Sequence, residues 1–581
     1  MTGTQFRVLY REFLFRVVDR ELLSTYAQGD MSRLLLRFVS LLISMGLLYA
    51  APAALIQQNT TPHAMLALGF RTIDALLATT MLTVGLFTVL SWNTIYPDRL
   101  DALVLTPLPV RRHIIFLAKI AALVSGLGVA VLALHTAPSL LWPLRFYSAL
   151  STIGDAPNVI RMFLAYWITM IAASLFIACL VIGLQGLAAT LLPRPAFLRV
   201  SSYLQLATFV VVITFYFLLP AAVTPAIRAV AEQGTFNPLV LPPWYWFLAM
   251  FQQLSGIEQI GPIAHYAWWG VGLTLGWTMV AYTLSYFRTL RKIAEESDIA
   301  KRSRHGGWWP RVGSAQQTAI AHFAVRTLIR STQHRVLLAF YWGVGFAITT
   351  LFLTLFFRGL KSPTLSQEAL WHERSVLLIA ANVVMLMAAI LGARVVFALP
   401  RDLRANWIFR ITPLRGGTEY LGARRRALFV ASVLPVWLLS VVVFFASWPP
   451  LPAAGHLVLL WLLGSILVEL YLYGTRKIPF TCSYLPGKST FQAAFWVSVL
   501  FLLLVTATFS AFERRTLDAP VLYAQLAGTL GIIWLLARTI TSIQARGADS
   551  QPQFEEEPGD RLVSLDVWDH RFPPGVKERL P

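Results

Sequence analysis

Long apolar stretches alternate with short polar and basic ones along the whole chain. About twelve of them reach about twenty residues, enough for a helix to cross about 30 Å of hydrocarbon. They lie at 38–56, 75–95, 116–137, 163–191, 203–222, 262–286, 336–357, 376–397, 427–447, 455–474, 492–510 and 521–540. A helix satisfies its own backbone hydrogen bonds, which lipid cannot do. The pattern therefore predicts an all-α polytopic membrane protein.

The composition supports this interpretation and disfavours a soluble enzyme. Hydrophobic residues make up 57% of the 581 positions and charged residues only 13%, whereas soluble domains carry roughly a quarter charged residues. The net charge of +20 would indicate nucleic acid or a membrane surface for a soluble protein. Here the cations fall in alternate loops, so we expect membrane lipid and no nucleic acid as a partner. Cys179 and Cys482 lie outside any metal or disulfide motif, and no cofactor is expected.

Lys and Arg are concentrated in every second loop. Such an excess marks the cytoplasmic side of a membrane protein. The basic segments are the N-terminus, the loops after the second, fourth, eighth and tenth spans, and 288–335. We therefore expect both termini in the cytoplasm and a multi-pass location in a bacterial inner membrane. Arg514 and Arg515 are an exception, because they fall in a short outward loop.

The two halves of the chain resemble each other. Phe13-Leu-Phe-Arg16 aligns with Phe323-Ala-Val-Arg326 before the first span of each half, and Thr106-Pro107-Leu108 aligns with Thr412-Pro413-Leu414. An even number of spans per half makes the repeats parallel. The predicted units are an interfacial elbow helix at 1–33, a six-span half at 34–287, a basic linker with a second elbow helix at 288–335, a six-span half at 336–543, and a polar tail at 544–581, for which the composition predicts disorder.

An amphipathic stretch precedes each half. In 6–23, Phe6, Leu9, Phe13 and Val17 share one helical stripe, while arginines occupy another. This pattern suits a helix lying in the cytoplasmic headgroup plane, and 319–335 is its counterpart in the second half. The alternative is a simple flank to the first span.

The loop 96–112 carries the most informative pattern. Pro97 can open a helix, and Asp98 and Asp101 are favourable near its positive end. Leu100, Leu103 and Val104 then share one face before Pro107 ends the helix. The loop therefore predicts a short amphipathic cytoplasmic helix, with an ordinary solvated loop as the alternative.

This loop resembles that of ABC-2 type transporter permeases, in its Pro97-Asp98-Arg99 start, its Thr106-Pro107-Leu108-Pro109 close and the Arg111-Arg112 that follows. The resemblance implies six-helix units that begin with an elbow helix. It also implies that the loop docks on a separate ABC ATP-binding subunit. The first docking surface would comprise Pro97, Asp98, Arg99, Asp101, Leu103, Pro107 and Pro109; the second would comprise Pro400, Asp402, Arg404 and Pro413, where the second half departs from the pattern by three extra residues.

We expect no ATPase site in the chain itself, and hence no enzyme. The only candidate phosphate loop, Cys482 to Ser489, has cysteine where the motif needs glycine, and it lies between two spans. Hydrolysis would therefore occur on the partner subunit. One chain carries two docking loops, although two copies could also assemble as a homodimer.

Two polar residues inside the spans are candidates for a transport pathway, because such residues are costly in lipid. They are Asn382 in the eighth span and Glu469 in the tenth, with Arg476 about two turns from Glu469. The alternative role for each is hydrogen bonding between helices.

Three functions remain open from the sequence. The first is the permease of an ATP-driven exporter, as the resemblance implies. The second is an ion-coupled secondary transporter of twelve spans, although its loop between the second and third spans is Gly-rich, whereas 96–112 has three prolines and no glycine. The third is a membrane scaffold that transports nothing.

Overall fold

The computed structural model describes most of the chain. The described residues are 2–18, 39–40, 42–47, 62–95, 105, 108–151, 158–193, 196–197, 200–216, 243–256, 263–295, 313–359, 367–397, 417–473, 480, 491–516 and 519–546. Within these ranges all regular secondary structure is helical, with no strand. This confirms the all-α class.

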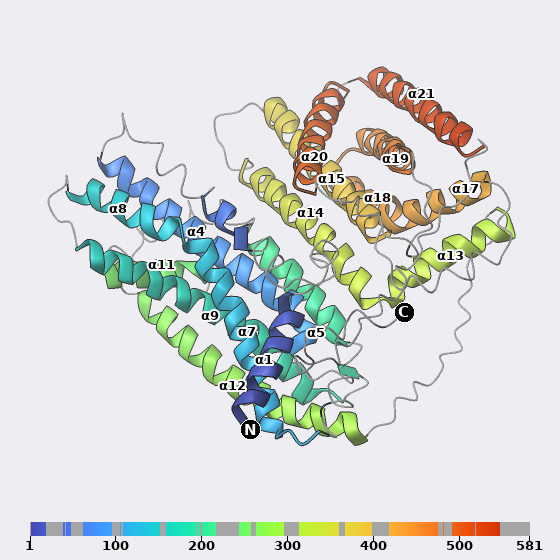
Figure 1. Cartoon of the computed structure of the whole chain (residues 1–581). Helices are drawn as coiled ribbons and strands as arrows, with labels where there is room; N and C mark the ends of the chain where they lie inside the picture. Colours follow the sequence, from blue (N-terminus) through green and yellow to red (C-terminus); the bar gives the residue numbers. More distant parts are fainter. Residues whose placement is uncertain are drawn as a thin grey trace, which may run out of the picture.

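The helices form two groups along the chain, which Figure 1 shows as a blue-to-green bundle beside a yellow-to-red one. The first contains α1 (Thr2–Val18), α4 (Pro62–Leu90), α5 (Trp92–Ile95), α7 (Arg112–His135), α8 (Pro138–Ser151), α9 (Val159–Leu191), the helix Val200–Tyr216, α11 (Trp244–Ser255) and α12 (Ala264–Glu295). The second contains α13 (Ala315–Arg330), α14 (Thr332–Gly359), α15 (Gln367–Phe397), α17 (Gly417–Leu428), the π-helical turn η4 (Phe429–Val433), α18 (Leu434–Ser447), α19 (Pro450–Leu472), α20 (Phe491–Arg514) and α21 (Pro520–Gln544).

Eight helices in the described part are long and apolar enough to cross a membrane. They coincide with eight of the predicted spans and run over Gly69–Leu90, Arg112–His135, Val159–Leu191, His334–Leu353, Ser375–Phe397, Gly417–Ser447, Pro450–Leu472 and Val521–Gln544. The predicted span 492–510 lies within α20, 262–286 overlaps α12 from its first residue, and 203–222 overlaps the shorter Val200–Tyr216. The span 38–56 is described only over parts of 39–47, where it is helical. The total of twelve spans stays a prediction.

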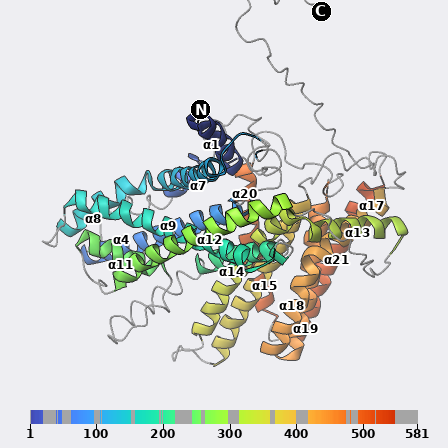
Figure 2. The ribbon, with the colours of Figure 1, turned by 90° about the horizontal axis from the view of Figure 1, so that it is seen from below.

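Helix pairs with matching positions in the two groups pack together. The amphipathic helix α1 packs on α7, as Figure 2 shows, and α13 packs on α17. Further along, α9 packs on α12 and α19 packs on α21. The second and fourth apolar helices of each group are also in contact, as α4 with α9 and α15 with α19.

Small residues allow the α9–α12 pair to approach closely. A Cβ atom built on Gly186 would lie 3.1 Å from the backbone carbon of Ala281. One turn before, the Thr278 hydroxyl donates a 2.5 Å hydrogen bond to the carbonyl of Cys179. Glycine at such a crossing lets two backbones pack without an intervening side chain.

The π-helical turn η4 precedes a proline in α18. A proline cannot donate a backbone hydrogen bond, and its ring clashes with the carbonyl four residues earlier. Here the proline is Pro435 and the crowded carbonyl belongs to Ala431, inside η4. The wider turn gives that carbonyl room, so the long helix from α17 to α18 continues through the proline.

The two bundles meet through Val200–Tyr216 and α14. The rings of Phe209 and Phe340 lie 5.2 Å apart in an edge-to-face arrangement. Phe209 and Ala347 belong to one buried apolar cluster that also includes Val89 and Val181. The contact is largely apolar, and the Arg335 guanidinium of α14 adds a cation–π contact, 5.6 Å from the centroid of the Tyr203 ring.

Candidate functional site

The predicted docking loops fall largely outside the described residues. Of the first set, Pro109 is described, whereas Pro97, Asp98, Arg99, Asp101, Leu103 and Pro107 are not. All of the second set, Pro400, Asp402, Arg404 and Pro413, lies outside the described ranges. Both docking surfaces therefore stay predictions, but the structure describes the two ends of the first loop.

The start of the first loop is held by side chains from three other helices. Tyr282 of α12 donates a 2.8 Å hydrogen bond to the backbone carbonyl of Ile95, the last residue of α5. Gln185 of α9 donates one of 2.9 Å to the carbonyl of Trp92. Gln205 donates one of 2.8 Å to the carbonyl of Val89 at the end of α4.

These three donors are buried, which makes the bonds effective anchors. Gln185 and Gln205 are each 2% exposed, and Tyr282 is also buried. The indole of Trp92 adds a fourth bond, donating to the Ser201 hydroxyl at 2.7 Å. Carbonyls at a helix end lack partners within the helix, so side chains from neighbouring helices can bind them. The chain therefore enters the loop from a fixed point.

The end of the first loop rests on α1. Leu105 and Val110 pack against a buried cluster that includes Phe13 of α1 and Ile115 of α7. The Lys119 ammonium lies 5.2 Å from the centroid of the Phe13 ring. This arrangement fixes the point where the loop joins α7.

The apolar stripe predicted for α1 contacts α7 over Phe6, Leu9 and Phe13, while the side chain of Val17 lies outside the described part. Phe13 is buried and Phe6 and Leu9 are half-buried, whereas Arg7 and Arg11 are exposed. The two helices run antiparallel, and the Tyr10 hydroxyl donates a 3.0 Å bond to Ser125, halfway along α7. The interfacial location of α1 stays a prediction.

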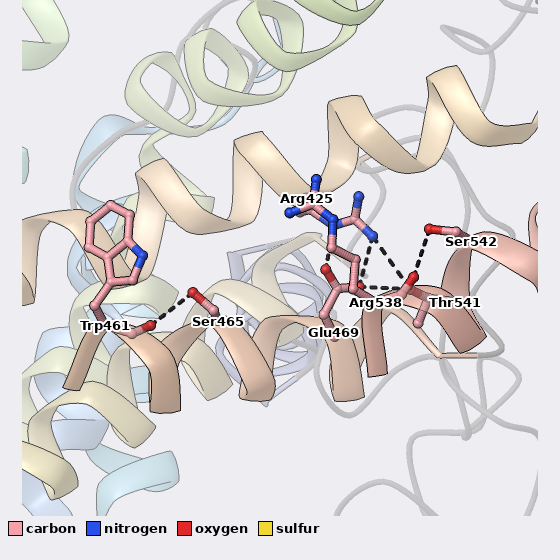
Figure 3. Close-up of polar contacts among 7 residues, drawn as sticks. All are labelled: Arg425, Trp461, Ser465, Glu469, Arg538, Thr541 and Ser542. Atoms are coloured by element: carbon pink, nitrogen blue, oxygen red, sulfur yellow. Dashed lines mark hydrogen bonds and ion pairs between the residues drawn. The ribbon is translucent and has the colours of Figure 1, made fainter. Parts of the chain in front are cut away.

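Glu469 is buried in a polar cluster that joins α17, α19 and α21 (Figure 3). The Arg425 Nε atom lies 2.5 Å from Glu469 Oε1, and Arg425 Nη2 donates to Oε2 at 2.9 Å. The Thr541 hydroxyl donates to the same Oε2 at 2.8 Å. Both carboxylate oxygens are thus engaged within one bundle. The sequence placed Arg476 nearest, but that residue lies outside the described ranges, and the partner found is Arg425.

Asn382 belongs to a second buried cluster in the same bundle. Ser440 of α18 donates to Asn382 Oδ1 at 2.8 Å, and Asn382 Nδ2 lies 2.9 Å from His456 Nε2. His456 Nδ1 lies 2.7 Å from Glu513 Oε1. An amide nitrogen only donates, so Nε2 accepts and Nδ1 carries the proton that is donated to Glu513. The cluster thus links α15, α18, α19 and α20.

The first bundle also contains a buried histidine. His135 Nε2 lies 2.9 Å from the Thr80 hydroxyl of α4, and His135 Nδ1 lies 2.6 Å from the Tyr166 hydroxyl of α9. All three residues are buried. Each bundle therefore has a buried histidine that binds side chains of two other helices, but it lies on the third apolar helix (α7) in the first bundle and on the fourth (α19) in the second.

Sequence reasoning missed Arg425, Ser440, His456 and Glu513. The available signal was that each is a polar residue inside or beside an apolar helix, where burial requires a hydrogen-bonded partner. In the part of the chain that the structure describes, no group of three or more His, Cys, Asp or Glu side chains could hold a metal ion.

The helices and their polar contacts define the class of the protein: it is an all-α, multi-pass membrane protein. Comparison with protein-family models, curated proteins and solved structures finds no match.

Proposed function

We propose that this protein is the membrane-spanning subunit of an ATP-driven exporter of the ABC-2 type, in a bacterial inner membrane. A separate ATP-binding subunit would dock on the loops at 97–109 and 400–413. The observation that supports the proposal best is the anchoring of the first loop at both ends.

Such anchoring is what a coupling loop requires. A force on the loop reaches Ile95 and Trp92, whose carbonyls are bound by Tyr282 and Gln185. Leaving a buried polar group unpaired costs about 1–3 kcal/mol, so the bonds resist separation. Movement of the loop would therefore shift α9 and α12 with it, instead of unwinding α5.

The proposal includes two parallel six-helix units. The matching contacts α1–α7 and α13–α17, and α9–α12 and α19–α21, support this division. A glycine lies at a close contact in each of the pairs α9–α12 and α19–α21, because a Cβ built on Gly186 or Gly455 would press on Ala281 or Tyr523.

Substrate movement would depend on motion of one bundle against the other. Their described contact, between Val200–Tyr216 and α14, is largely apolar, with one cation–π contact from Arg335 to Tyr203, and it contains no ion pair among the described residues. Apolar contacts are non-directional, so they permit small rotations at little cost. Glu469 and Asn382 make closed contacts within one bundle, which favours a role in helix packing over one in the pathway.

Affinity purification tests the partnership. We expect the tagged full-length chain, extracted in mild detergent, to bring down a P-loop ATPase identified by mass spectrometry. The variant Asp98→Ala/Arg99→Ala/Asp402→Ala should reduce its recovery. Asp155→Ala, in the predicted outward loop, is the matched control and should leave recovery unchanged.

The opposite results would reject the proposal. Wild-type protein that is folded and monodisperse, yet recovers no ATPase from membranes of its own host, would show that no such subunit binds. If Asp155→Ala reduces ATPase recovery as much as the triple variant does, the docking loops have no special role in binding it.

A further inference from the structure

A cleft of about 820 Å³ opens between α14, α15 and α20. Its walls are apolar side chains one helical turn apart, Ile348 and Phe352 on α14 and Val376, Ala380 and Val384 on α15. Side chains four residues apart lie on one face of a helix, so each helix contributes a continuous stripe. The cleft is thus an apolar groove parallel to the helices.

Two arginines lie at one end of this groove. Arg514 and Arg515, at the end of α20, line the cleft and are exposed. Neither side chain makes an ion pair with a residue that the structure describes. Arg514 and Arg515 are also the exception to the expected concentration of Lys and Arg in the cytoplasmic loops, because they fall in a predicted outward loop. Two guanidinium groups with no ion-pair partner among the described residues thus lie at the mouth of an apolar groove, where an anion could accept charge-assisted hydrogen bonds from both.

Two buried hydroxyl groups lie one and two turns below Arg514. Ser510 and Thr506 are 4% and 7% exposed, line the cleft, and have no hydrogen-bond partner among the described residues. Thr508 on the same helix behaves differently, since its hydroxyl donates to the Leu504 carbonyl at 2.7 Å. A buried hydroxyl without a partner is costly. Ser510 and Thr506 are therefore available to a ligand in the cleft.

The length of the groove matches one leaflet of a bilayer. It extends along α20 from Leu502 to Arg514, a separation of 514 − 502 = 12 residues, which is about 18 Å at 1.5 Å per residue. Half of the hydrocarbon core is about 15 Å thick. A molecule with a charged head at the arginines would thus place its tail along the apolar stripes.

We propose that this cleft binds an anionic diacyl phospholipid. Arg514 and Arg515 bind the phosphate, since guanidinium groups match phosphate oxygens in geometry and charge. Ser510 and Thr506 donate hydrogen bonds to the ester oxygens below it. The acyl chains lie against α14 and α15. This site is independent of the proposed export function and would exist in a scaffold or a secondary transporter of the same fold.

The simpler explanation for the arginines is local. Cations are favourable near the negative end of a helix, and long side chains reach the headgroup region on their own. That explanation predicts no preference among lipids and no role for the cleft. It also leaves Ser510 and Thr506 unexplained, so the two explanations can be separated by experiment.

Photo-crosslinking provides the test. The full-length protein is reconstituted in phosphatidylcholine vesicles that contain phosphatidylglycerol with a photoactivatable acyl chain, and the labelled residues are mapped by mass spectrometry. We expect labels on the residues of α14, α15 and α20 that line the cleft. Unlabelled phosphatidylglycerol should compete, whereas phosphatidylcholine and inorganic phosphate should not.

Two variants address the head and tail contacts separately. Arg514→Gln/Arg515→Gln should reduce labelling by at least about tenfold, as expected for the loss of charge-assisted hydrogen bonds. Ala507→Phe/Ala511→Phe keeps both charges and fills the groove, and it should reduce labelling as strongly. The control Arg538→Gln/Arg546→Gln removes two exposed charges near the C-terminal end of α21, a helix that does not line the cleft. This variant should be labelled like the wild type. Undiminished labelling in either cleft variant, or equal competition by phosphatidylcholine, would overturn the proposal.

Discussion

The hydroxyl of Tyr282 binds the backbone carbonyl of Ile95 at 2.8 Å, across 187 residues of sequence. This bond ties the last apolar helix of the first bundle to the point where the chain leaves α5. Gln185 does the same for α9, one turn earlier on the carbonyl of Trp92. The position of the first loop is therefore mechanically linked to the positions of α9 and α12, whatever protein binds to the loop.

Removing this link should loosen the loop without unfolding the protein. In Tyr282→Phe the ring still packs, but the Ile95 carbonyl loses its donor, a loss of about 1 kcal/mol. We expect amide hydrogen exchange in the peptide 92–112 to increase about fivefold. Tyr473→Phe, at an exposed residue of the second bundle, is the control. Exchange that stays at the wild-type rate would show that the bond does not hold the loop.

A second prediction concerns the Arg425–Glu469 pair. Glu469→Gln leaves the Arg425 guanidinium, whose side chain is only 20% exposed, beside a neutral amide. Breaking a buried pair costs about 3–5 kcal/mol, and the lower end applies because Arg425 is partly exposed. We expect a clear decrease in melting temperature in detergent. Arg330→Gln, which removes an exposed cation, should change it little.

The double variant distinguishes a lost pair from lost packing. Glu469→Leu with Arg425→Met replaces both charges by apolar side chains of similar size. It should recover most of the stability, because no uncompensated charge remains. A double variant that is as unstable as Glu469→Gln would mean that Thr541 and the surrounding packing, rather than the ion pair, determine the effect.

Glu469 also shows how far the sequence can be interpreted. A carboxylate in an apolar span must have a partner, and this necessity singles out Glu469 correctly. The sequence suggests Arg476 because it is close along the chain, whereas Arg425 is 44 residues away on another helix. Which helices become neighbours depends on packing between all of them, and the apolar pattern contains no such information.

The same limit applies to Asn382. Its polarity within an apolar span indicates a special role, but His456 and Glu513 are contributed by α19 and α20. By contrast, the apolar stripe of α1 and the positions of eight spans follow from local periodicity and length, so the sequence predicts them well. The docking residues in 97–107 and 400–413 stay predictions.

The histidine cluster of the second bundle should be essential for its stability. His456→Leu leaves the Glu513 carboxylate and the Asn382 amide buried without their shared partner. We expect a loss of about 3–5 kcal/mol, seen as a large decrease in melting temperature. Ser440→Ala, which removes one neutral hydrogen bond to Asn382, should cost only about 1 kcal/mol. If His456→Leu and Ser440→Ala lower the melting temperature by the same amount, the His456–Glu513 contact contributes no more than an ordinary hydrogen bond.

A close contact between α9 and the backbone of α12 gives the last prediction, in which two glycine-to-alanine changes have opposite signs. At Gly186 an added methyl group would lie 3.1 Å from backbone carbon of Ala281, and backbone cannot rotate away. Overpacking of this kind costs about 1–3 kcal/mol. At Gly276 of α12 the same methyl group meets nothing within 4 Å, so alanine gains about 0.5–1 kcal/mol from its higher helix propensity. Gly186→Ala should therefore melt below the wild type and Gly276→Ala slightly above it in the same detergent. A stabilising effect at both positions would show that α9 and α12 are farther apart than the structure places them.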